Sequence, residues 1–365
     1  VERPGQSVEP VALADGNGYD AEVSHLEALA AQASGIDAGA GDGTILVTGG
    51  TGTTGRLLLS WLLYEAQASR VIAFSRDEQK HHDLLQDPRF QHPALYSMVG
   101  DIRDPSRLRE AMEGVSLVLH TAAMKHVPIA EAHPSEAIRT NVEGTENLIR
   151  AARDAGVARV IAHSTDKAVE PSCVYGATKL AMEKLLVAAD LDSGPNGPRF
   201  DILRHGNLIG SRGSVIPMFR EQKKSGRLKV TDPEMTRFWI DPDSLISAVH
   251  QVVIDGRGGE IFVPRSPAAR LATVAAAIAP EAVIEVIGER PGEKKHESLT
   301  GQEESSRIRL FEQHLVIIPP ASGHLRRHDG SAVGPDFRLQ SDRGPWLDLQ
   351  AMQALLSSEL VCSHV

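Results

Sequence analysis

Short apolar runs rich in β-branched residues alternate with helical patterns from residue 44 onward. The runs that we predict as strands are residues 45–47, 71–74, 117–119, 160–162 and 202–203. Between them, residues 57–64 and 137–152 have apolar side chains at helical spacing, with lengths suited to right-handed crossovers between parallel strands. This alternation predicts an α/β fold with a doubly wound parallel sheet.

The chain divides into four segments by its pattern. Residues 1–43 have few aromatic side chains and one helical stretch at 20–33, and we expect an N-terminal extension outside the core. Residues 44–209 are expected to form the sheet domain. Residues 210–320 are irregular and punctuated by Gly and Pro, and are expected to form mainly a smaller substrate-binding lobe over the carboxyl edge of the sheet. Residues 321–365 are expected to be a loop and a terminal helix.

Composition narrows the class of protein. Of 365 residues, 38 are Lys or Arg and 48 are Asp or Glu, and the formal net charge of −10 disfavours a nucleic-acid groove. No apolar run approaches the roughly 20 residues of a membrane-spanning helix, and no signal-peptide pattern opens the chain. Cys173 and Cys362 are too few for a disulfide framework or a multi-cysteine zinc site. We therefore expect a soluble, cytoplasmic protein with no metal, nucleic-acid or membrane partner.

A glycine-rich turn joins the first predicted strand to the first predicted helix, and it contains Gly49, Gly52 and Gly55. Gly49 allows the tight turn and Gly52 lets the backbone approach a pyrophosphate. Gly55 permits close packing of the helix, whose amino end attracts the anion. This context predicts a dinucleotide-binding Rossmann domain, and the alternative is a turn that binds nothing.

The end of the second predicted strand indicates which dinucleotide is bound. NAD-preferring proteins usually place an acid there, on the ribose hydroxyls, but this sequence has Ser75 and Arg76. A guanidinium forms charge-assisted contacts with a 2′-phosphate, so we predict NADP as the cofactor. Asp77 and Glu78 follow directly and leave NAD as the alternative.

Tyr175 and Lys179 are the strongest candidates for catalysis. Their spacing of four puts both on one face of a helix, shortly after the strand predicted at 160–162. An ammonium beside a phenol stabilises the phenolate and lowers its pKa from about 10 toward neutrality. Because the glycine-rich turn at residues 49–55 precedes the pair in the sequence, the pair predicts a phenolic base that acts beside a nicotinamide. The alternative is a Tyr and a Lys on a solvated helix, where this spacing is common.

Nine motifs in a fixed order resemble those of one family. They lie at residues 48–55, 75–78, 120–128, 164–168, 175–180, 206–207, 210–215, 235–240 and 290–294. Together they are similar to the soluble inverting UDP-N-acetylglucosamine 4,6-dehydratases of the extended short-chain dehydrogenase/reductase superfamily, from about Thr44 to the terminal helix. The resemblance implies a Rossmann-type fold, NADP held throughout turnover, a UDP-sugar substrate in the smaller lobe and a homo-oligomer.

The resemblance also implies roles for individual residues at the cofactor and the substrate. Besides the three glycines, Tyr175 and Lys179, those expected at the cofactor are Thr51, Thr53, Thr54, Ser75, Arg76, Asp101, Ile102, Ala122 and Ala123. Those expected at the substrate are Lys125, Thr165, Asn207, Arg212, Val215, Arg237 and Arg290. For each charged residue expected at the substrate, the alternative is a surface ion pair. For Asp101, expected at the cofactor, the alternative is that its side chain caps the next helix.

A second acid/base pair is implied by the same resemblance. Lys167 is expected to exchange the proton at carbon 5 of the sugar, and Asp166 to protonate the departing hydroxyl group. The alternative is a salt bridge at the end of the preceding strand. Adjacent residues in a strand face opposite ways, so both side chains enter one pocket only if the strand has already ended there.

Two places depart from the family pattern. Thr53 and Thr54 stand where the family usually has Ser-Phe, and His205 stands where it usually has Tyr. These departures leave open a dehydratase for another nucleotide sugar in secondary metabolism.

Two further alternatives are tied to the catalytic residues. A nucleotide-sugar epimerase of the same superfamily would share Tyr175 and Lys179 but would not need Asp166 and Lys167. A non-catalytic NADP-sensing protein would be expected to lose the Tyr and the Lys, and both are present.

Overall fold

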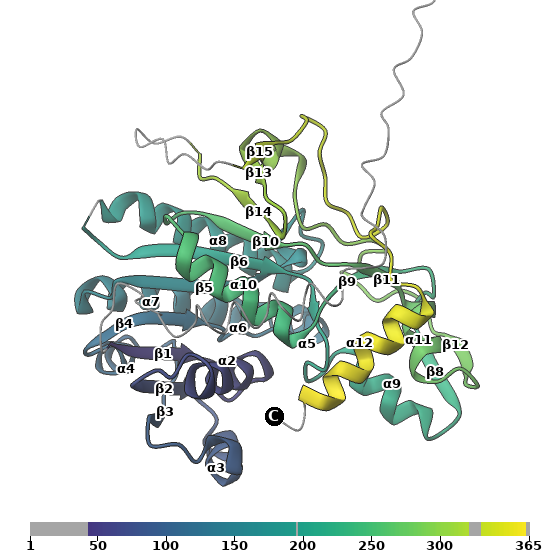
Figure 1. The fold of residues 1–365 in the computed structure, drawn as a ribbon, viewed down its shortest axis with the longest axis horizontal. Coiled ribbons are helices and arrows are strands. Elements are labelled where there is room, and N and C mark those ends of the chain that lie inside the picture. Colours follow the sequence, from purple (N-terminus) through teal and green to yellow (C-terminus); the bar gives the residue numbers. More distant parts are fainter. Residues whose placement is uncertain (1–42, 195, 321–329, 363–365) are drawn as a thin grey trace, which may run out of the picture.

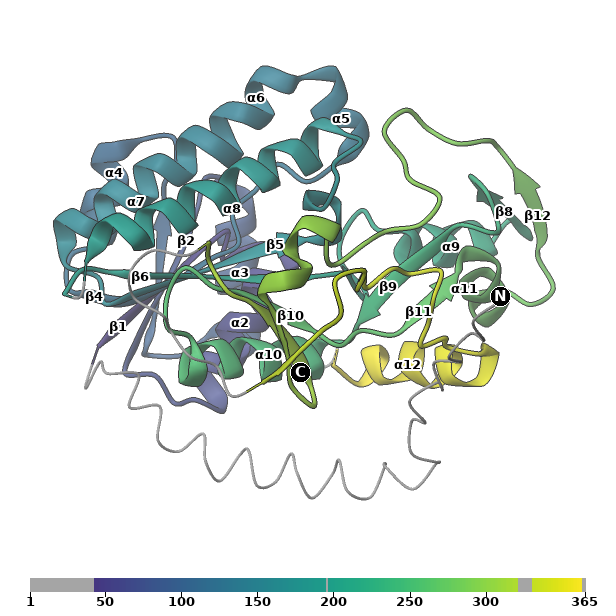
Figure 2. The ribbon, with the colours of Figure 1, turned by 90° about the horizontal axis from the view of Figure 1, so that it is seen from above.

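The computed structural model describes residues 43–194, 196–320 and 330–362. The expected extension up to residue 42, with its helical stretch at 20–33, lies outside these residues. So do residues 321–329 of the loop predicted at 321–335. Figures 1 and 2 show a twisted central sheet covered by helices on both faces, with a smaller lobe beyond one end of its strands.

Parallel strands form the centre of the sheet. In spatial order, those that the described residues show are β3 (Leu95–Val99), β2 (Arg70–Ser75), β1 (Thr44–Thr48), β4 (Val115–His120), β5 (Arg159–Thr165), β6 (Arg199–His205) and β10 (Ile261–Pro264). The order reverses between β1 and β4, and sheets of this kind bind ligands in the crevice at such a reversal, outside the carboxyl ends of the strands. The predicted doubly wound parallel sheet is confirmed.

Antiparallel strands that the sequence did not predict extend the sheet beyond β10. They are β14 (His314–Ile317), β13 (Ile308–Leu310) and β15 (Ser331–Ala332). All four residues of β10 are buried, because α10 (Pro242–Asp255) covers the sheet there and β14 pairs along its free edge. Part of the segment 210–320 therefore belongs to the large sheet.

Helices cover the sheet on both faces, as Figure 2 shows. One face packs against α4 (Pro105–Ala111), α7 (Gly144–Ala155) and α8 (Val174–Ser193), and the other against α2 (Thr53–Tyr64), α3 (Glu78–Gln86) and α10. The helix predicted at 137–152 is interrupted: α6 (Pro134–Ile138) passes through a π-helical turn, Arg139–Glu143, into α7. α5 (Val127–Ala132) precedes α6.

The small lobe has its own apolar core. It contains the strands β7 (Asn207–Leu208), β8 (Arg227–Val230), β9 (Thr236–Ile240), β11 (Ala268–Arg270) and β12 (Val283–Val286), and the helices α9 (Val215–Lys223), α11 (Leu271–Ile278) and α12 (Leu349–Cys362). Phe219, Trp239, Val274 and Met352 are buried together in it. The terminal helix α12 thus packs on the lobe, at the carboxyl end of the central strands (Figure 1).

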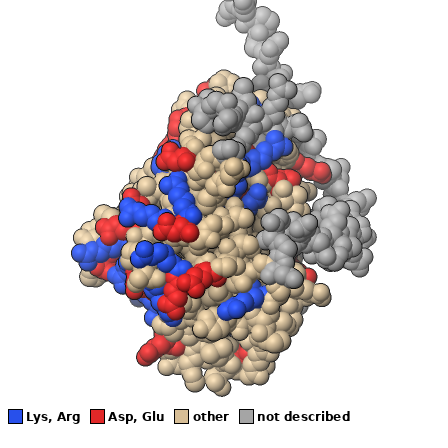
Figure 3. Space-filling view, turned by 90° about the vertical axis from the view of Figure 1, so that its left-hand side faces the viewer, with Lys and Arg blue, Asp and Glu red and all other residues tan. Residues whose placement is uncertain are grey.

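Figure 3 shows the end of the molecule opposite the small lobe, where basic and acidic side chains are interspersed. No helix in the described part of the chain is long and apolar enough to cross a bilayer. The described residues also contain no group of three or more His, Cys, Asp or Glu side chains arranged to hold a metal ion.

Candidate active site

A cavity of about 440 Å³ lies at the carboxyl ends of the central strands and is closed on one side by the small lobe. This volume is in the range of small-molecule sites. Many of the residues singled out in the sequence line it: Thr54, Ala123, Lys125, Thr165, Lys167, Tyr175, Lys179, Asn207, Val215, Arg237 and Arg290. Most of the substrate candidates and some of the cofactor candidates therefore meet in one place. The remaining cofactor candidates do not line this cavity: Gly49, Thr51, Gly52, Thr53, Gly55, Ser75, Arg76, Asp101, Ile102 and Ala122.

The glycine turn between β1 and α2 has the close packing that a pyrophosphate site requires. Gly49 has a φ of +70° and its N–H donates to the carbonyl of Phe74 at 2.7 Å. A Cβ on Gly55 would overlap the carbonyl oxygen of Gly49. Gly52 is the N-cap residue that precedes α2, and it has no side chain to cap the helix. The N–H groups of the first turn can therefore donate to an anion. The turn fits the diphosphate of a dinucleotide.

A partly buried chain of hydroxyl groups and an imidazole lies at the end of β2. Thr51 Oγ1 is 2.8 Å from Ser75 Oγ, which is 2.9 Å from His81 Nε2, and His81 Nδ1 is 2.6 Å from Ser97 Oγ. This chain orients the hydroxyl of Ser75, and the sequence analysis missed His81. The side chain of Arg76, next to Ser75, is 57% exposed, so its guanidinium is accessible to a ligand phosphate.

Asp101 takes part in an ion-pair network beyond β3. Its carboxylate is 2.6 Å from Arg103, which also contacts Glu136 at 2.8 Å, and it is 4.0 Å from Arg76. The cap of α4 is Asp104, which accepts from the N–H groups of its first turn. The alternative that Asp101 caps this helix is therefore wrong.

Tyr175 and Lys179 both come from α8 and line the cavity, but the ammonium does not bond the phenol. Lys179 Nζ donates to the carbonyl of His163 at 2.5 Å and contacts Met182 Sδ at 3.0 Å. Burial lowers the pKa of Lys179 to about 8, although the Glu183 carboxylate acts in the other direction. Burial raises the pKa of Tyr175 to about 12, against the lowering effect of the Lys167 ammonium. The phenol is protonated in this state.

Asn141 was not singled out in the sequence, although it is a polar residue within an apolar helical stretch. Its side chain lies in the π-helical turn and bonds the main chain of Met124 in both directions, at 2.8 and 3.0 Å. Its amide also donates to Thr178 Oγ1 at 3.0 Å. Asn141 thus ties the loop that carries Ala123 and Lys125 to α8.

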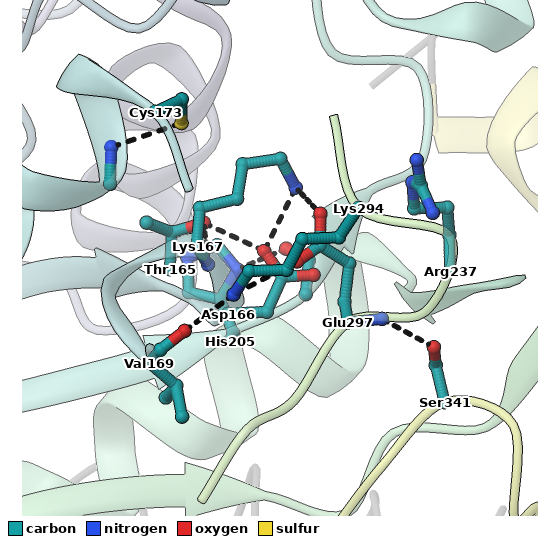
Figure 4. A network of polar contacts seen from close by, with 12 residues as sticks. Thr165, Asp166, Lys167, Val169, Cys173, His205, Arg237, Lys294, Glu297 and Ser341 are labelled. Atoms are coloured by element: carbon teal, nitrogen blue, oxygen red, sulfur yellow. Dashed lines mark hydrogen bonds and ion pairs between the residues drawn. The ribbon is translucent and has the colours of Figure 1, made fainter. Parts of the chain in front are cut away.

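Asp166 and Lys167 lie where β5 has already ended, in a 3₁₀ turn, Asp166–Ala168. Figure 4 shows the Lys167 ammonium between two carboxylates, 3.0 Å from Asp166 Oδ1 and 3.1 Å from Glu297 Oε1. Burial alone would lower the pKa of Lys167, but the two carboxylates outweigh it and raise the pKa above its usual value. Lys167 reaches the cavity wall, whereas the side chain of Asp166 is 0% exposed and lies behind it.

The sequence analysis missed Glu297, whose only signal is its place three residues after the motif at 290–294. Its N–H donates to Ser341 Oγ at 2.8 Å, and Ser341 N–H donates back to its carbonyl at 2.9 Å. Nearby, Arg204 Nη1 donates to the carbonyl of Leu299 at 3.0 Å and Lys294 Nζ to that of Val169 at 2.6 Å. These contacts hold the segment against the end of β5.

The remaining cations differ in how they are held. Arg237 is buried and donates to the carbonyls of Thr236 and Lys295, so its position is fixed. Arg290 is within 4.0 Å of Glu293, and burial lowers the pKa of Lys125. Arg212 does not line the cavity, and its N–H donates to Thr53 Oγ1 at 3.1 Å. Lys229 lines the cavity and was not predicted.

His205, the departure from the family pattern, also lines the cavity. Its Nδ1 is 2.9 Å from the carbonyl of Gly206, and its Nε2 is 3.4 Å from Nδ1 of His163. A carbonyl only accepts, so Nδ1 is the donor in the first contact. In the neutral ring Nε2 is then an acceptor. Burial lowers the pKa of His205, which favours the neutral ring.

Comparison with known proteins places most of the chain in one family. A profile of the polysaccharide biosynthesis protein family matches residues 45–319. The protein named UDP-N-acetylglucosamine 4,6-dehydratase (inverting) of Campylobacter jejuni is 40% identical over 312 residues, 82% of this chain and 93% of that protein. The protein named UDP-glucose 4-epimerase of Rickettsia canadensis is 41% identical over 277 residues, 73% of this chain and 80% of that protein.

Solved structures show the same architecture. Pen from Bacillus thuringiensis has a TM-score of 0.80 at 33% identity and covers 87% of this chain and 98% of its own. DesIV, a dTDP-glucose 4,6-dehydratase from Streptomyces venezuelae solved with NAD bound, has a TM-score of 0.61 at 27% identity and covers 69% of this chain and 86% of its own.

Proposed function

Since this chain belongs to the polysaccharide biosynthesis protein family, we propose that it is a 4,6-dehydratase for UDP-N-acetylglucosamine that inverts carbon 5. One observation carries the proposal. A phenol, Tyr175, and a second group able to transfer protons, the Lys167 ammonium with its carboxylates, line the same cavity. Loss of water needs both, because one proton must leave the carbon 4 hydroxyl and another must leave carbon 5.

A pyridine nucleotide fits the glycine turn and the open amino end of α2. Gly49, Gly52 and Gly55 would hold its diphosphate, and the bound nicotinamide would supply the hydride chemistry between carbon 4 and carbon 6 of the sugar. We propose NADP because Arg76 is exposed beside the oriented hydroxyl of Ser75, a pair suited to a 2′-phosphate. DesIV was solved with NAD, so cofactor choice is a property to be measured for this chain.

As the phenolate, Tyr175 takes the proton of the carbon 4 hydroxyl in the first step. The positive charges of Lys179 and Lys167 in the same cavity favour the phenolate. The ketone that forms at carbon 4 acidifies the proton on carbon 5, and the group around Lys167 carries the loss of water across carbons 5 and 6. Lys125, Arg237 and Arg290 in the cavity wall are proposed partners of the sugar diphosphate.

An epimerase at carbon 4 is the second candidate, favoured by the similarity to proteins named UDP-glucose 4-epimerase. Such an enzyme has no use for a proton-transfer group at carbon 5. The Lys167 ammonium, paired with Asp166 and Glu297 in the same cavity as Tyr175, is such a group and favours the dehydratase. His205 in the cavity wall leaves another nucleotide sugar as the alternative substrate.

Mass spectrometry tests the proposal directly. Purified protein is incubated with UDP-N-acetylglucosamine, and the nucleotide sugar is expected to lose one water without any net consumption of added cofactor. Product of unchanged mass would contradict dehydration, and loss of water only from a different UDP-sugar would move the proposal to that sugar. We also propose a homo-oligomer, which light scattering of the same sample measures.

A further inference from the structure

The imidazole of His81 lies at the end of β2, beside the place proposed for the cofactor. It comes from α3 and is 3% exposed. Its Nε2 is 3.0 Å from the carbonyl oxygen of Ser75 and 2.9 Å from the hydroxyl oxygen of the same residue. Its Nδ1 is 2.6 Å from Ser97 Oγ on β3. Both ring nitrogens are therefore held by residues of two neighbouring strands, β2 and β3.

These contacts fix the hydrogen on the ring. A carbonyl oxygen only accepts, so Nε2 carries the hydrogen and donates to Ser75. Burial lowers the pKa of His81, against the raising effects of the Ser75 carbonyl and of Asp77, and this favours the neutral ring. In the neutral ring Nδ1 is an acceptor, and the Ser97 hydroxyl is its donor.

The hydrogen on Nε2 in turn determines what the hydroxyl of Ser75 can do. A ring nitrogen that carries a hydrogen cannot accept another, so Ser75 Oγ meets Nε2 as an acceptor. The hydroxyl hydrogen of Ser75 is then directed to Thr51 Oγ1, at 2.8 Å, or to a bound ligand. When Thr51 donates to Ser75, the Ser75 hydroxyl is free to donate to an anion.

We propose that His81 is a positioning residue for cofactor choice: it holds the hydroxyl of Ser75 as a donor to the 2′-phosphate of NADP, beside the guanidinium of Arg76. The inference rests on the proposed use of NADP. An ionised phosphate offers acceptor oxygens whose hydrogen bonds are charge-assisted, whereas a ribose hydroxyl both donates and accepts. A donor fixed at Ser75 therefore adds more to the binding of NADP than to that of NAD.

Arg76 supplies charge at this place, and Ser75 supplies direction. The Arg76 side chain is 57% exposed and 4.0 Å from Asp101, and a long exposed side chain gives up conformational entropy when it binds an anion. The hydroxyl of Ser75 is already held through His81 and Thr51. Contacts that are fixed before binding lose less freedom on binding, so this hydroxyl is the point to which the phosphate is aligned.

Competition between the two dinucleotides tests the proposal by binding alone. Each protein is equilibrated with an equimolar excess of NADP and NAD, separated from free dinucleotide by gel filtration and denatured, and the released dinucleotides are quantified by chromatography. The variants are His81→Asn and His81→Gln, because the amide of Asn falls near the place of Nδ1 and that of Gln near the place of Nε2. His81→Asn is expected to lower the ratio of bound NADP to bound NAD about 10-fold, and His81→Gln to keep it within about twofold of wild type.

Ser75→Ala shows whether His81 acts through the hydroxyl. Alone, it is expected to lower the ratio about 10-fold or more. In the Ser75→Ala background, His81→Asn is expected to change the ratio by less than about twofold, because two changes to one contact are not additive. His82→Asn, at the exposed neighbour on α3, is the matched control and is expected to match wild type. A purely structural role of His81 would lower the melting temperature of the variants and leave the ratio unchanged.

The possible outcomes are distinct. A ratio for His81→Asn within about twofold of wild type would overturn the role of His81 and leave the proposed use of NADP standing. Equal losses in His81→Asn and His81→Gln, or additive losses in the double variant, would also overturn it. If His81→Asn does not fold, an unchanged ratio in Ser75→Ala overturns the proposal instead. If wild type itself binds more NAD than NADP, the proposed cofactor fails, the role of His81 fails with it, and the dehydratase stands.

Discussion

Lys179 donates a hydrogen bond of 2.5 Å to the main-chain carbonyl of His163, and this contact joins α8 to β5 at the floor of the cavity. The ammonium bonds this carbonyl and Met182 Sδ, and not the hydroxyl of Tyr175, four residues earlier on the same helix. In this state Lys179 therefore fixes the placement of α8 against β5 and makes no direct hydrogen bond to the phenol.

Tyr175→Phe tests the phenol as the base of the first step. We expect the fold and bound cofactor to be retained and turnover to fall on the order of 100-fold or more, because the group that accepts the carbon 4 proton is removed. Steady-state product formation measures this. Turnover near that of wild type would show that another group takes the proton.

Arg76→Ala tests cofactor choice. Loss of a charge-assisted contact costs about 1.5 to 3 kcal/mol, so affinity for NADP should fall about 10- to 100-fold, while NAD, which lacks the 2′-phosphate, should be little affected. Titration of cofactor-free protein with each dinucleotide measures both constants. Arg109→Ala, an exposed change on α4, is the matched control. Equal losses of affinity for NADP and NAD in Arg76→Ala would show that this guanidinium does not contact the 2′-phosphate.

Arg204 is expected to be important for stability. Its guanidinium is 1% exposed and bonds Glu183 at 2.6 Å and Glu304 at 2.9 Å, which ties β6 to α8 and to the 3₁₀ turn Gln302–Arg307. Arg204→Met should lower the free energy of unfolding by about 3 to 5 kcal/mol, because two buried carboxylates lose their counter-ion. Denaturant titration measures this, and a loss below about 1 kcal/mol would contradict the account.

The buried carboxyl of Asp201 should make stability depend on pH. Burial raises its pKa to about 7, and nearby Glu260 and Asp190 act in the same direction while Arg159 opposes them. Between about pH 4 and pH 7 the folded protein therefore holds a proton that the unfolded chain has lost. The contribution of this group to the free energy of unfolding falls as pH rises through that range, on the order of 2 to 4 kcal/mol in all.

Asp201→Asn isolates this effect, because the amide keeps an acceptor for the N–H of Gly258 and cannot ionise. Unfolding free energies of wild type and variant are compared at pH 5 and pH 8. The variant is expected to lose less stability between the two than wild type does. An identical change in both proteins would contradict the raised pKa.

Local patterns were enough to predict most of the central parallel strands and their ligand edge, although β3 and β10 are not among the predicted runs. The runs at 71–74 and 160–162 are apolar because helices cover both faces of a parallel sheet, and that signal is contained in a few neighbouring residues. β13 and β14 were missed because each is three or four residues long and forms only where β10 offers an edge to pair with. Pairing of this kind depends on partners distant in the chain.

The same distinction applies to the site. Tyr175 and Lys179 share a helix, so their spacing alone places them together. Glu297 meets Lys167 only because Ser341 and Arg204 hold its segment against the end of β5, and no local pattern contains those contacts. The place of Asp166 behind Lys167 follows from the 3₁₀ turn after β5, which the apolar pattern of the strand does not predict.

Incubation of the wild-type protein with UDP-N-acetylglucosamine in deuterated water, followed by NMR of the sugar, tests the central claim most directly. The account predicts a 4-keto-6-deoxy sugar that carries deuterium at carbon 5, since carbon 4 is oxidised with Tyr175 as the base and the group around Lys167 removes the proton beside it. A sugar that keeps its carbon 6 hydroxyl, inverts only at carbon 4 and carries no deuterium at carbon 5 would contradict it and identify an epimerase.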